Sequence, residues 1–157
     1  MNKFMKEANK LAQENIKNKN GGPFGAVIVK DDEIIGRGSN HVLKNNDPTA
    51  HAEIMAIREA CHNLNTYDLT GCDIYTSCYP CPMCLSAIIW ANIKNVYYGN
   101  TKEDAEQIGF IDKKIYNYID ALNDNEEDNS LNLVELDRNE TIKTFQEFSK
   151  DEDKIIY

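Results

Sequence analysis

Short strand-type runs alternate with helical segments between residues 24 and 98, and this order restricts the fold more than any other feature. Runs rich in β-branched and aromatic residues predict strands over residues 24–29, 34–39, 73–77 and 96–98. Helices are predicted over residues 48–64 and 82–90. The first two strands form an antiparallel hairpin, whereas the following strand, helix, strand order favours parallel pairing. The expected fold class is α/β, a three-layer α/β/α sandwich with a mixed central sheet.

An amphipathic helix is expected at the start of the chain. Apolar residues recur there at three- and four-residue steps, which places on one face Phe4, Ala8, Leu11, Ala12 and Ile16. The helix should end near residues 18–22, where Asn and Gly residues break the pattern.

Asp47 and Pro48 predict the start of the helix that leads to residue 64. Asp can cap free backbone N–H groups, and Pro at the first helical position loses no hydrogen bond. Residues 44–47 are then a loop. The buried side of this helix is expected to be Ile54, Ile57 and Cys61.

The last third of the chain has weaker patterns. Residues 102–120 are expected to be helical, and residues 123–129 form an acidic loop. Residues 131–136 are a candidate edge strand, and residues 140–148 a final helix.

The length and composition are typical of one folded domain. The chain has 157 residues, of which 41% are hydrophobic and 27% charged. Its longest nearly apolar runs, residues 24–29 and 87–91, are far shorter than the roughly 18 residues that a membrane-spanning helix needs. The first 19 residues lack the apolar segment of a secretory signal. We therefore expect no membrane association and a cytoplasmic location.

The net charge of −9 is concentrated in one part of the chain. Residues 101–157 carry seven Lys or Arg against sixteen Asp or Glu, and the preceding residues are balanced. Sequence-independent binding to nucleic acid depends on Lys and Arg that displace phosphate counterions. The distribution therefore disfavours a nucleic-acid partner.

The five cysteines indicate a metal or catalytic site more than a disulfide framework. Their number is odd, and three of them, Cys78, Cys81 and Cys84, fall within seven residues. Cys61 and Cys72 are expected to be small buried residues without a special role.

Two segments at predicted helix starts carry the chemistry: residues 51–53 and residues 80–84. His51, Cys81 and Cys84 supply three ligands of the types that zinc prefers, which leaves the fourth tetrahedral position open. An open position is typical of a catalytic site. On an ideal helix Glu53 would point about 200° away from His51, so it reaches the same water only if the zinc lies beyond the helix end.

Less specific interpretations of these residues remain open. The three ligands could belong to a structural zinc site, or the two cysteines to a redox C-x-x-C. Cys78 and Cys81 also form a C-x-x-C, and a closed four-ligand site that included Cys78 would be structural. Phe24 and Trp90, taken alone, are typical core aromatics.

The motifs resemble those of a known family. H-x-E in residues 51–53, followed by P-C-x-x-C in residues 80–84, is similar to the signature of the cytidine deaminase superfamily of zinc-dependent nucleobase deaminases, in which the Glu transfers protons. Residues 21–27, 46–51 and 87–91, with the terminal Tyr157, further resemble the bacterial guanine deaminase branch, essentially over the full length.

The resemblance implies a role for each of several residues. Glu53 would be the proton shuttle, and Asp112 would contact the departing amino group and help move its proton. The purine would be bound by Asn40, Phe24, Trp90, Ala52 and Tyr157. Tyr79 departs from the branch, which more often has Glu there, and this leaves contacts at the rim of the site in doubt.

The resemblance also implies an assembly. Residues 1–157 would form a single deaminase domain and a homodimer, in which the segment 130–157 is swapped and Tyr157 covers the partner's active site.

The implied function is the zinc-dependent hydrolysis of guanine to xanthine and ammonia in purine catabolism. One alternative is deamination of another base, either adenosine in tRNA or free cytosine. Another is a non-catalytic zinc-binding module, which would have a closed four-ligand site and no need for Glu53.

Overall fold

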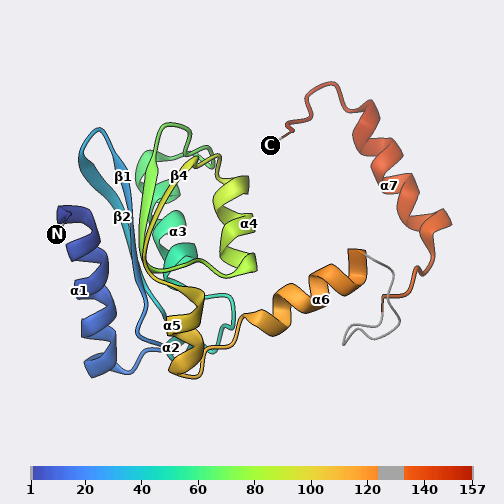
Figure 1. The fold of residues 1–157 in the computed structure, drawn as a ribbon. Helices are drawn as coiled ribbons and strands as arrows, with labels where there is room; N and C mark the ends of the chain where they lie inside the picture. The colour runs from blue at the N-terminus through green and yellow to red at the C-terminus, as the bar shows by residue number, and fades with distance from the viewer. Residues whose placement is uncertain (1, 124–132, 157) are drawn as a thin grey trace. The chain divides into compact units, whose positions relative to one another are not determined.

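The computed structural model describes residues 2–123 and 133–156, in two compact units, residues 1–116 and 117–157. The first unit holds α1 (Lys3–Asn18), β1 (Gly25–Lys30), β2 (Glu33–Ser39), α2 (Val42–Asn45), α3 (Ala52–Leu64), β3 (Asp73–Cys78), α4 (Pro82–Trp90), β4 (Asn95–Asn100) and α5 (Lys102–Gln107) (Figure 1). Helix α6 (Lys113–Asn123) begins in the first unit and ends in the second, which also contains α7 (Arg138–Lys150). Within the described residues, every helix is too short or too polar to cross a membrane.

The four strands form one mixed sheet in the order β2-β1-β3-β4. Strand β1 is antiparallel to both of its neighbours, β2 and β3, and β3 pairs with β4 in parallel. The parallel pairing predicted from the chain order is therefore direct only between β3 and β4 in this sheet. The first hairpin places β1 between β2 and β3, which run in the same direction.

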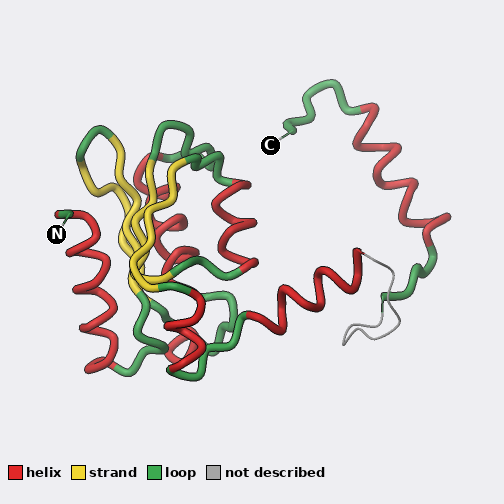
Figure 2. The backbone as a smooth tube through the Cα atoms, viewed as in Figure 1, coloured by secondary structure: helices red, strands yellow, loops and turns green. Residues whose placement is uncertain are grey.

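Helices cover both faces of the sheet, which confirms the three-layer sandwich. Helix α1 lies on one face, and α3 and α4 lie on the other (Figures 1 and 2). Because side chains alternate along a strand, β1 contributes to both layers: Ala26 and Ile28 pack in the cluster that includes α3, and Val27 and Val29 pack with Phe4 of α1. Strands covered on both faces read as continuous apolar runs, as residues 26–29 do.

Helix α1 follows the predicted apolar face except at its end. Phe4, Ala8, Ala12 and Asn15 are buried, whereas Ile16 is 63% exposed. The sequence prediction that Ile16 completes this face is therefore wrong. At 3.6 residues per turn, residue 15 lies closer than residue 16 to the face that Phe4, Ala8 and Ala12 present to the sheet.

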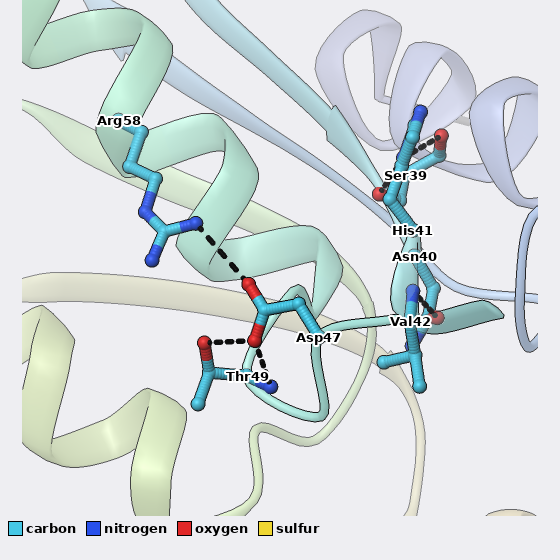
Figure 3. A network of polar contacts seen from close by, with 7 residues as sticks. All are labelled: Ser39, Asn40, His41, Val42, Asp47, Thr49 and Arg58. Carbon is cyan, nitrogen blue, oxygen red and sulfur yellow. Dashed lines mark hydrogen bonds and ion pairs between the residues drawn. The ribbon is translucent and has the colours of Figure 1, made fainter. Parts of the chain in front are cut away.

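Helix α3 begins at Ala52, four residues later than Pro48. The Asp47 carboxylate accepts hydrogen bonds from the Thr49 backbone N–H (2.8 Å) and hydroxyl (2.7 Å), and it pairs with Arg58 at 3.7 Å (Figure 3). Asp47 thus closes a turn that precedes the helix, instead of capping the helix itself. Part of the loop predicted just before it forms the short helix α2.

The buried side of α3 also differs from the prediction. Its fully buried residues are Ala52, Glu53, Ala56 and Ala60, while Ile54, Ile57 and Cys61 are only partly buried. Small residues are needed on this side because β2 approaches the helix closely. A Cβ atom at Gly38 of β2 would lie 2.1 Å from the Ala52 carbonyl oxygen.

The last third forms separate short helices. The predicted helix over residues 102–120 is interrupted between α5 and α6, where Gly109 has φ of 97°. Residues 133–137 have no strand structure, which contradicts the described part of the edge strand predicted at 131–136, and α7 confirms the final helix. Apart from Asn123, the acidic loop predicted at 123–129 lies outside the described residues, as do residues 131 and 132.

The close contact between β2 and α3 generates a stability prediction. We expect Gly38→Ala to lower the free energy of unfolding by about 1–3 kcal/mol, because the added methyl group must push α3 away from the sheet. Ser39→Ala, one residue along the same strand, is the control and should change stability much less. Urea denaturation of both variants tests this, and equal stability of the two would contradict the close packing.

Candidate active site

Two helix starts meet at one edge of the sheet and carry the predicted metal ligands. Strands β2 and β3 point the same way, so α4, which follows β3, and α3, which follows β2 after the short α2, both begin near the carboxyl ends of these strands. His51 is the N-cap residue of α3, Cys81 is the N-cap residue of α4, and Cys84 lies in the first turn of α4. In open α/β sheets this edge is the usual place for a ligand site.

The three side chains have the spacing of a zinc site. Their ligand atoms all lie within 4.8 Å of one another, and His51 Nδ1 is 3.6 Å from each of the sulfurs of Cys81 and Cys84. Tetrahedral zinc, with its usual bond lengths to sulfur and nitrogen, would hold these atoms about 3.6 Å apart. The donor set and its geometry therefore fit zinc.

The thiol chemistry also favours a cation here. Hydrogen bonds from Cys84 and His51 hold the pKa of Cys81 below its usual range. The same contact between the two thiols, together with burial, raises the pKa of Cys84. Two neighbouring thiols cannot both ionise easily unless a cation compensates the charge, and a bound metal does this.

Cys78 is not part of the ligand group. Among the described residues, the clustered metal-ligating atoms are those of His51, Cys81 and Cys84. The Cys78 thiol instead donates to the Thr101 carbonyl oxygen at 3.5 Å, and burial raises its pKa to about 11. A protonated thiol directed elsewhere does not support the closed four-ligand site.

Glu53 lies against this group in the first turn of α3. Its side chain is buried, and its two oxygens accept hydrogen bonds from Thr76 Oγ1 (2.8 Å) and Cys84 Sγ (3.3 Å). Burial raises the pKa of Glu53 above its ordinary value. Although Glu53 follows His51 by only two residues, its carboxylate reaches the ligand group, because Oε2 lies 3.3 Å from Cys84 Sγ. A carboxylate with a raised pKa is suited to accept and return a proton.

A cavity of about 490 Å³ opens beside these residues, large enough for a nucleobase. Its lining includes His51, Cys81 and five other predicted site residues: Phe24, Asn40, Ala52, Glu53 and Asp112. Phe24 packs edge to face against Phe110, with ring centroids 4.9 Å apart. The cavity therefore combines an apolar aromatic wall with a few polar groups, the usual composition of a small-molecule site.

Asn40 is held in a defined orientation at this cavity. It is buried, and its Oδ1 accepts a hydrogen bond from the Val42 backbone N–H at 3.1 Å (Figure 3). The amide nitrogen is then the end of the side chain that remains to donate to a ligand.

Asp112 enters the cavity from the segment between α5 and α6. Burial raises the pKa of its carboxyl group, and the negative charge of Cys81 adds to this effect. The site thus contains two carboxyl groups, Glu53 and Asp112, and both are favoured in the protonated form relative to exposed ones.

Two of the predicted residues are not placed in the cavity. Trp90, at the end of α4, is 68% exposed and is not among the cavity-lining residues, and Tyr157 lies outside the described residues. Sequence reasoning gave no role to Phe110, although it lines the cavity. The available signal was its position two residues before Asp112, which makes it a neighbour on the same segment.

The chain is similar to several known deaminases. Residues 1–100 match the family model described as the cytidine and deoxycytidylate deaminase zinc-binding region. Guanine deaminase of Bacillus subtilis is 56% identical over 117 residues, which cover 74% of this chain and 75% of the relative. A tRNA-specific adenosine deaminase of Buchnera aphidicola is 39% identical over 129 residues, covering 82% and 80%.

The fold comparison agrees. The crystal structure of guanine deaminase from Bacillus subtilis matches with a TM-score of 0.92 and 46% identity, and the match covers 100% of this chain and 99% of that one. With the His, Cys and Cys ligand group, the buried Glu53 and the family match, the chain belongs to the cytidine and deoxycytidylate deaminase family of zinc-binding enzymes.

Proposed function

We propose that this protein is a guanine deaminase, which hydrolyses guanine to xanthine and ammonia with one zinc ion per chain. The observation that carries the proposal is the buried Glu53 beside His51, Cys81 and Cys84, at the wall of a cavity of nucleobase size. The similarity to guanine deaminase of Bacillus subtilis supports this substrate among the bases that the family deaminates.

The ligands of the proposed zinc are His51, Cys81 and Cys84. When bound, zinc supplies Lewis-acid activation of water, which makes a nucleophile available at neutral pH. Glu53 takes a proton from the attacking water, which adds at C2 of the purine, and returns the proton to a ring nitrogen. Thr76 holds one oxygen of this carboxylate at 2.8 Å, so that Glu53 is oriented before the substrate arrives.

Asp112 acts at the departing group. It lines the same cavity, and its raised pKa favours transfer of a proton to the amino group. The C2–N bond then breaks, ammonia leaves, and Glu53 accepts the proton of the C2 hydroxyl as the carbonyl of xanthine forms. Phe24 and Phe110 provide the apolar surface against which the base stacks and from which water is excluded. Ala52, at the start of α3, contributes a small side chain to the same wall.

Asn40 favours guanine over adenine. Its amide nitrogen is a donor, and guanine presents acceptors at O6 and N7, where adenine has an amino donor in place of O6. A tRNA substrate, as in the adenosine deaminases of the family, is disfavoured by the acidic charge of residues 101–157. The protein would then act on a free base in the cytoplasm, in purine catabolism.

The proposed assembly is a homodimer in which the segment 130–157 covers the partner's active site, with Tyr157 as part of the lid. Many large apolar residues of this segment are exposed within the chain: Leu133, Val134, Leu136, Phe145, Phe148, Ile155 and Ile156. Such a surface is expected to be covered by another protein surface. In that assembly Trp90, exposed on α4, would be available as a further wall of the site.

The ligand assignment predicts the metal content of two variants. Cys84→Ala should lose both zinc and activity, because it removes one of the three ligands. Cys78→Ala, three residues before Cys81, is the matched control and should keep one zinc per chain. Metal analysis of the purified proteins measures this. Retention of zinc in Cys84→Ala together with its loss from Cys78→Ala would contradict the assignment.

The role of Glu53 predicts a loss of turnover without a loss of metal. Glu53→Gln keeps the size of the side chain but cannot accept the proton, so we expect kcat with guanine to fall about 10²-fold or more. Glu59→Gln, on the exposed side of α3, is the control and should leave kcat unchanged. Release of ammonia is the assay. Parent-like turnover in Glu53→Gln would exclude its role as the shuttle and favour a non-catalytic module.

The swapped segment predicts complementation between two weak variants. A chain shortened by residues 155–157 lacks the lid, and a Glu53→Gln chain lacks the shuttle. If the tail crosses to the partner, a mixed dimer holds one site with both an intact Glu53 and a donated tail, and activity returns when the two are refolded together. No recovery, with mixed dimers shown to form, would mean that each tail closes over its own site.

A further inference from the structure

A polar residue interrupts the apolar face of α1. Asn15 is only 1% exposed and occupies the place in the last turn where the sequence pattern predicted an apolar side chain. The rest of this face, Phe4, Ala8 and Ala12, packs as expected. A buried amide at such a position must satisfy its hydrogen bonds within the protein.

The Asn15 amide connects two segments that line the cavity. Its Nδ2 donates one hydrogen bond to the Gly22 carbonyl oxygen (2.7 Å) and one to the Asn40 carbonyl oxygen (2.8 Å). The first carbonyl lies two residues before Phe24, and the second belongs to the residue proposed to recognise the base. One side chain of α1, which lies on the face of the sheet opposite α3 and α4, thus fixes the segments at Gly22 and at Asn40.

The arrangement costs stability. Asn15 Oδ1 is buried without a hydrogen-bond partner within the described residues. Burial of an unpaired amide oxygen is unfavourable, so a residue that served only to fill the core would not need this group. Rotation of the amide would place the oxygen against the two carbonyls, which fixes the orientation in which Nδ2 donates.

Asn40 depends on this contact for its position. Its backbone N–H donates to the Phe24 carbonyl oxygen at 3.1 Å, and its side chain is held by Val42, so the Asn15 bond to its carbonyl completes the set. The loop at Gly21 packs closely against this side chain, because a Cβ atom at Gly21 would lie 2.0 Å from Asn40 Oδ1. A shift of either segment therefore moves the donor that faces the base.

We propose that Asn15 is a positioning residue for base recognition, which acts by holding Asn40 and the Gly22 segment in register. This inference rests on the proposed function, because it assigns Asn15 to the same purine site. Asn15 is not among the residues that line the cavity, and its two hydrogen bonds go to Gly22 and Asn40, which do. Its effect on the reaction therefore passes through Asn40 and the segment that leads to Phe24.

The test replaces the amide donor with groups of similar size. Asn15→Asp places oxygen atoms against both carbonyls, and Asn15→Leu fills the space without a donor, which provides a second variant if the first does not fold. We expect the KM for guanine to rise about 10- to 100-fold in either variant, since small displacements of positioning groups have effects of this size. Zinc content and kcat should change little, because a lost binding contact acts mainly on KM.

Coupling to Asn40 separates positioning from a general structural role. In an Asn40→Ala background, the Asn15 substitutions should raise KM by a clearly smaller factor than they do in the parent, because one of the two groups that they displace is already gone. Asn2→Ala is the control: it removes the N-cap of α1, whose side chain accepts from Phe4 and Met5 N–H, without touching the contacts of Asn15. It should lower stability and leave KM unchanged.

The outcomes distinguish this inference from the proposed function. An unchanged KM in stable Asn15 variants, or additive effects with Asn40→Ala, overturns the inference while guanine deamination by the parent stands. A parent without activity on guanine contradicts the proposed function instead. Hydrogen exchange of peptides covering residues 20–25 and 39–43 then decides the inference: faster exchange of both in the Asn15 variants but not in Asn2→Ala supports it, and unchanged exchange overturns it.

Discussion

The close packing of α3 on β2 is the constraint on which the site depends. Glycine in the strand and the alanines of the helix let the two backbones approach until a single added methyl group at Gly38 would collide with the Ala52 carbonyl. This contact sets the height of the first turn of α3 above the sheet. His51 is the N-cap residue of α3 and Glu53 lies in its first turn, so the positions of both follow from backbone contact rather than from loop geometry.

Burial and neighbouring charged groups set the protonation states of the ionisable side chains in this site. Glu53 and Asp112 have raised pKa values because both carboxyl groups are taken out of water beside the thiolate of Cys81. In the proposed reaction, a cation held by the thiols and the imidazole would lower this cost, and both carboxyl groups would transfer protons. Burial also raises the pKa of Cys78, which is close in sequence but directed toward Thr101, so Cys78 remains a neutral thiol.

Some features of the fold and of the site could be predicted from the sequence, and others could not. The grouping of His51, Cys81 and Cys84 was predictable because zinc chemistry requires those residue types at those spacings, and the mixed sandwich followed from the order of strands and helices. The start of α3 was not predictable from the sequence, because Asp47 accepts a hydrogen bond from the Thr49 backbone N–H in a turn that precedes the helix. Phe110 and Asn15 carried no chemical signature of their own, so only their contacts across the fold reveal them.

The sequence by itself determined the reaction chemistry and the fold class of this protein. Both depend on local patterns: ligand type, helix starts and the alternation of apolar residues. Only the tertiary structure decided which face of α3 is buried and which groups line the cavity. It also decided that Asn15, rather than Ile16, is the last buried residue on the apolar face of α1. These depend on how closely two backbones approach and on which buried carbonyls need a donor, and such long-range contacts leave no periodic trace along the chain.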